Sequence, residues 1–341
     1  REGLVLCGCR DGSVYAVRAA DGALAWRFHA EPEERRIVSH GQLESVWPVP
    51  GSILVLDDLA VVSAGRTSFL DGGIRLYGLD PRTGELRFEK TLWTRDKDGV
   101  QVLDEEGVDG WLNDVLSSNG KRIFMRHQVL DLNGERVSER IPHLHAPDGF
   151  VSADTTERIH WTYGPGFTSF HQGAFYDQRL NRTLFPTGLL LVEDEEVVYG
   201  FGQNHFDKPR AEVGGKWALF SAAKESGVPL DRTARQYLEM GRKAAPTVRL
   251  GWWKQIPIHV RAMVKTKDIL FVAGAPGGGA TTREALDGKA PGVLLAVSPA
   301  DGRVLNELRL PSMPVWDGMA AVKGKLLLAL TGGEVVELRE K

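Results

Sequence analysis

A small group of histidine residues has the types and spacing that could support chemistry. His143 and His145 are separated by one residue, so both imidazoles lie on the same side of an extended segment. One more histidine would complete a set of three metal ligands, and the candidates are His127 and His160. Histidines this far apart in a sequence are also common as surface or hydrogen-bonded residues, and that alternative stays open.

Two arginines extend the possible chemistry to anionic ligands. Arg126 and Arg261 could each hold a carboxylate through paired hydrogen bonds. A guanidinium that neutralises a uronate carboxylate, next to a histidine that removes the adjacent proton, would give lyase chemistry. The alternative for both arginines is a salt bridge to a neighbouring structural unit.

Familiar catalytic motifs are missing from the sequence. It has no Gly-x-Ser-x-Gly elbow, zinc-protease helix or calcium loop. The glycine-rich segment 274–279 lacks the Lys-Ser/Thr pair of a phosphate-binding loop. Cys7 and Cys9 share one face of a predicted strand, where a disulfide between them would be strained. Buried inert thiols, a strained bond and a soft-metal site remain as alternatives for this pair.

Composition excludes one class of partner. The chain has 42 basic and 45 acidic residues and a net charge of -3, which argues against nucleic-acid binding. No apolar run is long enough to span a membrane, so we expect no membrane span. The sequence begins at Arg1 without a methionine or a leader, and we expect that further residues upstream of Arg1 contribute to the protein.

An internal repeat predicts the architecture. Segments 14–22, 76–84 and 294–302 are near copies, each a strand followed by a tight turn that ends in glycine. In the second repeat, four strands are predicted at 51–57, 59–64, 73–79 and 85–92. This pattern predicts an all-β protein, a β-propeller of about seven four-stranded blades.

We predict one propeller domain over residues 1–341. The predicted blades cover residues 1–30, 43–92, 113–141, 149–187, 188–256, 257–310 and 314–341. A short helix is predicted as an insertion in the fifth blade, at 225–246, because Asp231 fits an N-cap and Pro246 would end the helix.

These repeats resemble those of PQQ-like (quinoprotein-like) propellers. Segment 12–28 looks like their blade repeat, and segments 35–49 and 316–320 resemble uncharacterised planctomycete-type bacterial members. The resemblance implies a periplasmic or extracellular location. Family enzymes hold pyrroloquinoline quinone between a tryptophan and a disulfide of adjacent cysteines, with a calcium ion. Because this chain has no adjacent cysteines, we predict no cofactor, with a divalent metal as the alternative.

Residues just before the innermost strands of a propeller converge on one end of its channel, the funnel face. The binding candidates on this face are Glu44, Trp47, Arg66, Trp111, Asp114, Arg126, His127, His259, Arg261, Trp316 and Asp317. Tryptophan and aspartate at such positions also commonly cap blades through backbone hydrogen bonds.

Two classes of function follow. The first is a non-catalytic propeller that binds a protein or carbohydrate partner through its funnel face. The second is a channel-mouth enzyme, either a lyase or hydrolase acting on acidic polysaccharide or a quinoprotein-like oxidoreductase. We favour the first because no recognisable catalytic set is present.

Overall fold

The described chain consists entirely of β-strands, turns and loops, as predicted. The computed structural model describes residues 3–39, 41–50, 53–100, 102, 113–146, 161–165, 186–203, 217–225, 248–277 and 287–339. The chain divides into two compact units. Unit 1 comprises residues 1–158 and 165–169, and unit 2 comprises residues 159–164 and 170–341.

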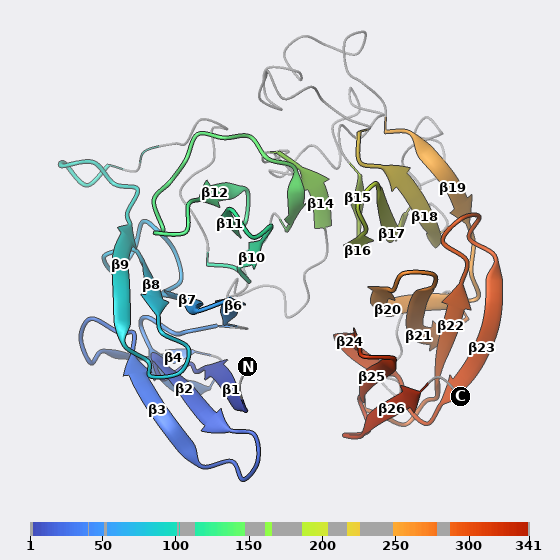
Figure 1. Cartoon of the computed structure of the whole chain (residues 1–341), viewed down its shortest axis with the longest axis horizontal. Helices are drawn as coiled ribbons and strands as arrows, with labels where there is room; N and C mark the ends of the chain where they lie inside the picture. Colours follow the sequence, from blue (N-terminus) through green and yellow to red (C-terminus); the bar gives the residue numbers. More distant parts are fainter. Residues whose placement is uncertain are drawn as a thin grey trace, which may run out of the picture. The chain divides into compact units, whose positions relative to one another are not determined.

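Unit 1 contains three sheets and one separate hairpin (Figure 1). Its strands are β1 (Leu4–Gly8), β2 (Ser13–Arg18), β3 (Leu24–His29), β4 (Arg36–Ser39), β5 (Gln42–Ser45), β6 (Leu54–Leu56), β7 (Leu59–Ala64), β8 (Ile74–Leu79), β9 (Leu86–Leu92), β10 (Ser117–Ser118), β11 (Ile123–Met125), β12 (Gln128–Leu130) and β13 (His143–His145). The sheets run β1-β2-β3, β6-β7-β8-β9 and β10-β11-β12, each with antiparallel neighbours.

Unit 2 repeats this organisation with longer strands. Its strands are β14 (Trp161–Gly164), β15 (Thr187–Gly188), β16 (Leu190–Glu193), β17 (Val197–Gln203), β18 (Trp217–Ala223), β19 (Leu250–Lys254), β20 (Ile258–Lys265), β21 (Leu270–Pro276), β22 (Gly292–Val297), β23 (Val304–Leu310), β24 (Pro314–Val322), β25 (Lys325–Leu330) and β26 (Val335–Arg339). Two four-stranded sheets, β16 to β19 and β20 to β23, are followed by the three-stranded sheet β24 to β26.

The hydrophobic core lies between consecutive sheets. Val14 and Trp26 of the first sheet share one apolar cluster with Val62 and Leu79 of the second. Further clusters join the second sheet to the third in unit 1, and each sheet of unit 2 from β16 onward to the next. This packing follows from period-2 alternation, because the longer strands present apolar side chains on their buried faces.

One kind of contact recurs between neighbouring sheets. Trp26 on β3 covers Gly84 in the turn before β9, and a β-carbon there would lie 2.7 Å from the indole. Trp252 on β19 covers Gly302 in the same way, and Phe88 on β9 covers Gly134. Gly84 has a φ of 75°, in the left-handed region that favours glycine. The repeated glycine therefore allows both the turn and the aromatic contact.

The predicted strands of the second repeat are confirmed, while the structure differs from the prediction at two places. Residues 43–45, placed in the second blade, belong to β5, which pairs with β4 in a separate two-stranded hairpin. The third sheet has three strands, with only an isolated bridge from Leu130 to Arg136 where a fourth was predicted. The helix predicted at 225–246 lies outside the described residues except for its first position.

The glycine contact generates a matched test. Gly22 ends the first repeat with a φ of 72°, but no described atom lies within 4 Å of a β-carbon built there. We expect Gly22→Ala to cost roughly 1–2 kcal/mol for the left-handed backbone alone. Gly84→Ala should cost about 1–3 kcal/mol more, because the methyl group would displace Trp26. Denaturant unfolding of both variants measures the difference, and equal losses would contradict the docking role of Trp26.

Candidate functional site

Glu44 is the centre of the polar cluster on the loops of unit 1. It lies on β5 and is buried, and it forms ion pairs with Arg66, in the loop after β7, and with Arg10, at 3.5 Å, in the turn after β1. Burial, and after it the nearby charge of Arg10, lowers the pKa of the Arg66 guanidinium. The Arg66 Nε has no hydrogen-bond acceptor among the described residues. Glu44 therefore provides a direct counter-charge for Arg66, and the charge of Asp71 also favours the protonated guanidinium.

Trp47 connects this cluster to a second arginine. The guanidinium of Arg35 lies over its indole, 4.8 Å from the ring centroid, and forms an ion pair with Asp71. Trp47 itself is buried in the core between the first and second sheets. Trp47, one of the predicted binding candidates, thus packs into the core and holds the segment after β5 in place. Arg35 covers the outer face of its indole.

The base of the β4–β5 hairpin is held by a buried carboxylate. Glu31 accepts two hydrogen bonds from Arg36 at 2.5 and 3.2 Å, and one from the Ser45 hydroxyl at 2.7 Å. Arg36 also donates to the Asp11 carbonyl at 3.0 Å, which links the hairpin to the turn between β1 and β2. The bidentate, partly buried pair of Glu31 and Arg36, together with the Ser45 hydrogen bond, restrains both strands at the base of the hairpin.

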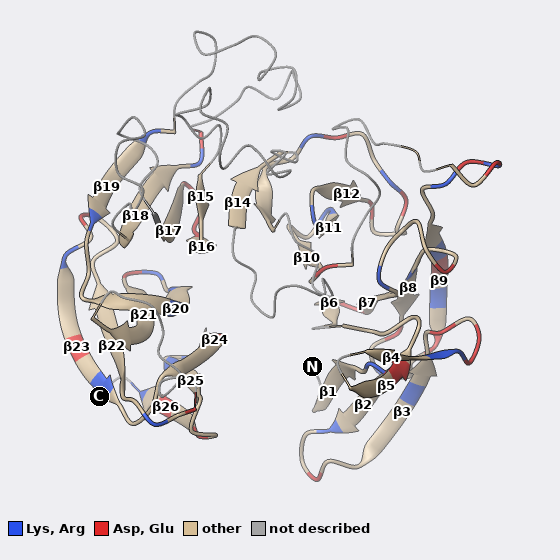
Figure 2. Ribbon diagram, turned by 180° about the vertical axis from the view of Figure 1, so that it is seen from behind, with Lys and Arg blue, Asp and Glu red and all other residues tan. Residues whose placement is uncertain are grey.

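The tip of the same hairpin is apolar and exposed. Val38 and Leu43 are directly opposite each other across the two strands, and they are 77% and 72% exposed. Basic and acidic residues surround β4 and β5 on the adjoining loops (Figure 2). A paired apolar tip with a charged surround resembles the composition of protein-binding surfaces, which have an apolar centre and a polar rim.

Asn113 extends the network toward the third sheet. Its amide donates to the Gly65 carbonyl at 2.8 Å, and its side-chain oxygen accepts from Ser63 at 2.6 Å. The neighbouring Asp114 is buried and accepts a hydrogen bond from the backbone N–H of Val115 at 2.6 Å. The Asn113 contacts connect two loops, whereas the Asp114 contact is local to its own segment. Trp111 lies outside the described residues.

Three of the candidate histidines, all in unit 1, do come together, but in the interior. His127, His143 and His145 are all buried, as is Arg126. The two nitrogens of His143 lie 2.8 Å from the Ile141 carbonyl and 2.7 Å from the Arg126 carbonyl. Because carbonyls only accept, the ring can make both hydrogen bonds only when both nitrogens carry a proton.

His145, in contrast to the His143 ring with its two hydrogen bonds, favours the neutral form. It is fully buried, and burial lowers its pKa well below the usual value of 6.5, with the charges of His143, His127 and Arg126 acting in the same direction. Its Nδ1 lies 3.4 Å from the His143 carbonyl. The cluster therefore contains one ring bonded at both nitrogens and one ring that favours the neutral form.

This arrangement does not favour a metal site. The His143 nitrogens face carbonyl oxygens, so neither presents a lone pair to a cation. Within the described ranges, no three histidine, cysteine or acidic side chains are grouped in a way that could hold a metal ion. His160 lies outside those ranges.

The predicted site residues of unit 2 form an aromatic and cationic cluster. His259 packs edge-on against Phe201 and Trp217, with ring centroids 5.4 and 4.9 Å apart. Arg261 lies 5.4 Å from the Trp316 ring centroid and donates to the Pro314 carbonyl at 3.3 Å. Asp317 has a φ of 53°, inside the irregular section where β24 leaves its pairing with β25. Arg261 is buried and makes both of these contacts within unit 2.

The exposed apolar residues are the part of the site that sequence reasoning missed. Segments 35–39 and 42–45 are short runs with apolar residues, Ile37, Val38 and Leu43, on either side of Gly41, and a glycine between two such runs signals a hairpin. The sequence could have predicted this hairpin. It could not show that Val38 and Leu43 lack covering neighbours, because exposure depends on residues far away in the chain.

Comparisons with known proteins agree with this architecture. A family model described as outer membrane protein assembly factor BamB matches residues 1–127. The crystal structure of BamB from Moraxella catarrhalis is 12% identical, with a TM-score of 0.50, over 99% of this chain and 82% of that chain. The sheets and this similarity define a β-propeller protein. Residues 1–127 are thus similar to the repeats of that family, and at 12% identity the likeness over the rest of the chain supports the fold alone.

Two other solved structures have lower scores. Quinohemoprotein alcohol dehydrogenase from Comamonas testosteroni is 12% identical, with a TM-score of 0.49, over 96% of this chain and 61% of that chain. The computationally designed Ika8 protein is 11% identical, with a TM-score of 0.39, over 100% of this chain and 94% of that chain. No curated protein matches the sequence significantly. The described residues include no helix suited to spanning a membrane.

The cysteines do not fit the quinone-binding arrangement that the resemblance implies. Cys7 lies on β1 and Cys9 directly follows that strand, and both thiols are free. The Cys7 thiol donates to the Tyr15 carbonyl at 3.7 Å, across the β1–β2 pair. A thiol held along a strand pair cannot provide the disulfide of adjacent cysteines expected beside the quinone, so we derive no function from this cofactor.

The ion pairs of Glu44 predict that replacing this carboxylate with an amide of the same size lowers the stability of the protein. Glu44→Gln should destabilise the protein by about 2 kcal/mol, because it removes the carboxylate that is paired with the partly buried Arg66. The control is Glu34→Gln, since Glu34 is exposed and lies 3.8 Å from Arg36. Denaturant unfolding should show a clear loss for the first variant and almost none for the second. Similar losses would contradict the structural role of Glu44.

The buried His145 predicts a pH dependence. Below its usual pKa of 6.5, the unfolded chain binds a proton at this position and the folded chain does not. Stability should therefore fall as the pH decreases from 6.5 toward the lowered pKa, by up to about 1.4 kcal/mol per pH unit. His145→Gln should reduce the slope of unfolding free energy against pH by up to one proton. An unchanged slope would show that His145 titrates equally in both states.

Proposed function

We propose that this chain is a non-catalytic propeller that binds a protein partner, and that the β4–β5 hairpin of unit 1 is its main contact surface. The observation that carries the proposal is the exposed Val38–Leu43 pair at the tip of a hairpin whose base is restrained by Glu31 and Arg36. An exposed apolar pair on an ordered element can bury apolar area on association at little entropic cost.

The burial of the predicted site residues supports binding over catalysis. Arg126, His127, His143 and His145 lie in the interior, and the His143 nitrogens are bonded to backbone carbonyls. A general base must be able to reach the proton it removes. These side chains are better suited to holding loops in place, so we do not pursue the alternative of a lyase, hydrolase or oxidoreductase.

The comparisons support the same choice at the level of the family. The model that matches residues 1–127 is described as an outer membrane protein assembly factor, a description of a protein that works with other proteins. We propose an extracytoplasmic location on the same basis. A carbohydrate partner is the alternative for the same surface.

The proposal predicts a specific loss of binding. A photo-reactive residue placed at position 38 should cross-link a partner protein in cells, whereas one at Val335, which is 71% exposed on β26, should not capture it. With that purified partner, Val38→Asp combined with Leu43→Asp should weaken the affinity at least tenfold, or about 1.4 kcal/mol. The melting temperature should hardly change, because both side chains are exposed in the folded state.

The control variant for the affinity measurement is Val335→Asp. Equal weakening by both changes, or by neither, would refute the hairpin as the contact surface. If the protein binds a member of a glycan panel and the double hairpin variant does not, the partner at this surface is a carbohydrate and not a protein.

A further inference from the structure

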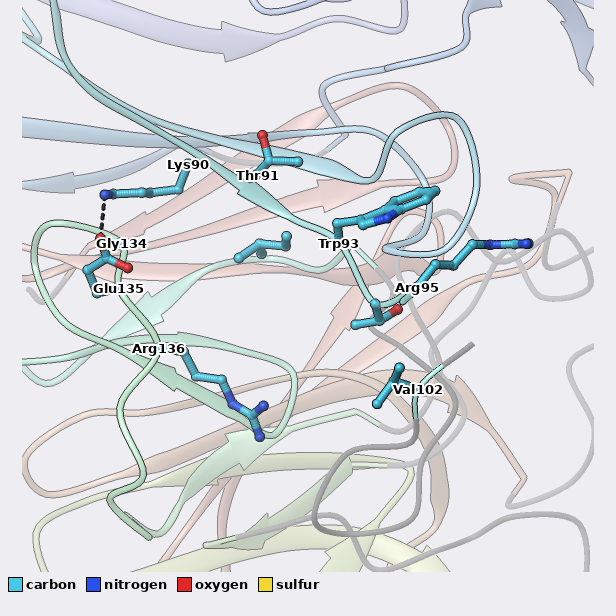
Figure 3. A pocket seen from close by; sticks show the side chains of 10 residues that line it. Lys90, Thr91, Trp93, Arg95, Val102, Gly134, Glu135 and Arg136 are labelled. Carbon is cyan, nitrogen blue, oxygen red and sulfur yellow. Dashed lines mark hydrogen bonds and ion pairs between the residues drawn. The ribbon is translucent and has the colours of Figure 1, made fainter. Parts of the chain in front are cut away.

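A groove in unit 1 lies beside the outer strand of the second sheet, away from the residues considered above (Figure 3). Its volume is about 410 Å³, which falls within the range of ligand-binding pockets, about 300–1,000 Å³. One wall is formed by the consecutive residues 90–95 of β9 and its continuation, and the other by residues 134–136 after β12. The side chains of consecutive residues in a strand point to opposite faces of the sheet. A wall that includes every residue from 90 to 95 is therefore formed by the edge of the strand, where its backbone is exposed.

Among the described residues, β9 has no partner strand on its outer side over part of its length. β9 is the last strand of its sheet and pairs with β8 on one side only. After β9 the chain returns, and the backbone N–H of Val102 donates to the Thr94 carbonyl at 2.8 Å. This contact closes the edge at Thr94, while no described strand pairs with residues 90–92. An open edge of this kind can accept hydrogen bonds from an added strand.

The groove carries positive charge. Lys90 forms an ion pair with Glu135 across it (Figure 3). Arg95 instead donates to two neutral acceptors, the Phe69 carbonyl at 2.6 Å and the Gly99 carbonyl at 2.9 Å. The nearby Asp96 carboxylate accepts the backbone N–H groups of Asp98 and Val100. Carbonyl bonds orient the Arg95 guanidinium without neutralising it, so the groove favours an acidic group.

Apolar side chains line the same groove. Trp93 directly follows β9 and is 43% exposed, and Val102, which also lines the groove, is exposed as well. Leu92 contributes a nearly buried surface to the same lining. An indole that stays half exposed beside an open strand edge can hold an aromatic or aliphatic side chain of a ligand.

We propose that this groove binds an extended, acidic peptide segment of a partner protein, added as a strand beside β9. The open backbone edge favours a peptide over a sugar, because only a peptide can continue the ladder of the sheet. Trp93 and Val102 take alternate apolar side chains, and Arg95 takes a carboxylate. This site is separate from the hairpin and does not depend on the function proposed for it.

Synthetic peptides test this inference directly. The probe is a fluorescent octapeptide, blocked at both ends, that alternates valine or phenylalanine with aspartate or glutamate. We expect it to bind the full chain with a dissociation constant below 1 mM and to slow hydrogen exchange in residues 90–92. A version with lysine in place of the acidic residues should bind at least tenfold more weakly. A version N-methylated on every second residue, which cannot complete the ladder, should lose binding to a similar degree.

Variants of the protein locate the site. Trp93→Ala should weaken binding of the acidic peptide at least fivefold, whereas Leu308→Ala on β23, an outer strand of unit 2, should not; Leu308 has a similar exposure of 44%. Glu135→Gln should strengthen binding about twofold or more, because it frees the charge of Lys90. The double hairpin variant Val38→Asp with Leu43→Asp should bind the peptide normally, so that failure of either site can be recognised separately.

Several results would overturn the proposal. They are the absence of binding up to 1 mM, equal binding of the acidic and lysine peptides, normal binding of the N-methylated peptide, or weakening by Leu308→Ala equal to that by Trp93→Ala. If a glucuronate oligosaccharide binds more tightly than the acidic peptide, and if Trp93→Ala abolishes that binding, the groove is a sugar site instead.

Discussion

The structure depends on the contact between an aromatic side chain of one sheet and a glycine turn of the next. Trp26 over Gly84 and Trp252 over Gly302 join sheets whose strands share no hydrogen bonds. The left-handed turn and the close approach of the ring each require glycine, so one residue satisfies two constraints at once. These contacts set how each sheet lies on its neighbour, and thereby where the connecting loops emerge.

The repeats and the sheet organisation could be predicted because their signals are local. Alternating apolar residues and a glycine turn specify a strand pair within about ten residues of sequence. Glu44 and Arg66 were predicted as binding candidates from their positions between strands. The sequence could not show that Glu44 is buried between two arginines. Which charged residues of distant segments form ion pairs depends on how the sheets pack, and the spacing of residues in the sequence does not indicate this.

The exposed surfaces were the least predictable part of the molecule. The Val38–Leu43 pair and the Trp93 groove are defined by which neighbours fail to cover them. Such exposure is a property of the folded chain, whereas residue type suggested burial for all three side chains. In contrast, the histidines and arginines that suggested chemistry are enclosed, since buried polar groups with backbone partners can connect loops as well as catalyse.

The restrained base of the hairpin has a consequence for the entropy of association. Glu31, Arg36 and Ser45 order both strands while the protein folds, so their conformational freedom is already lost before any partner arrives. A partner that covers the tip immobilises only short, stiff side chains. Rigidity at one end of the hairpin thus lets its exposed end bind with little opposing loss of freedom.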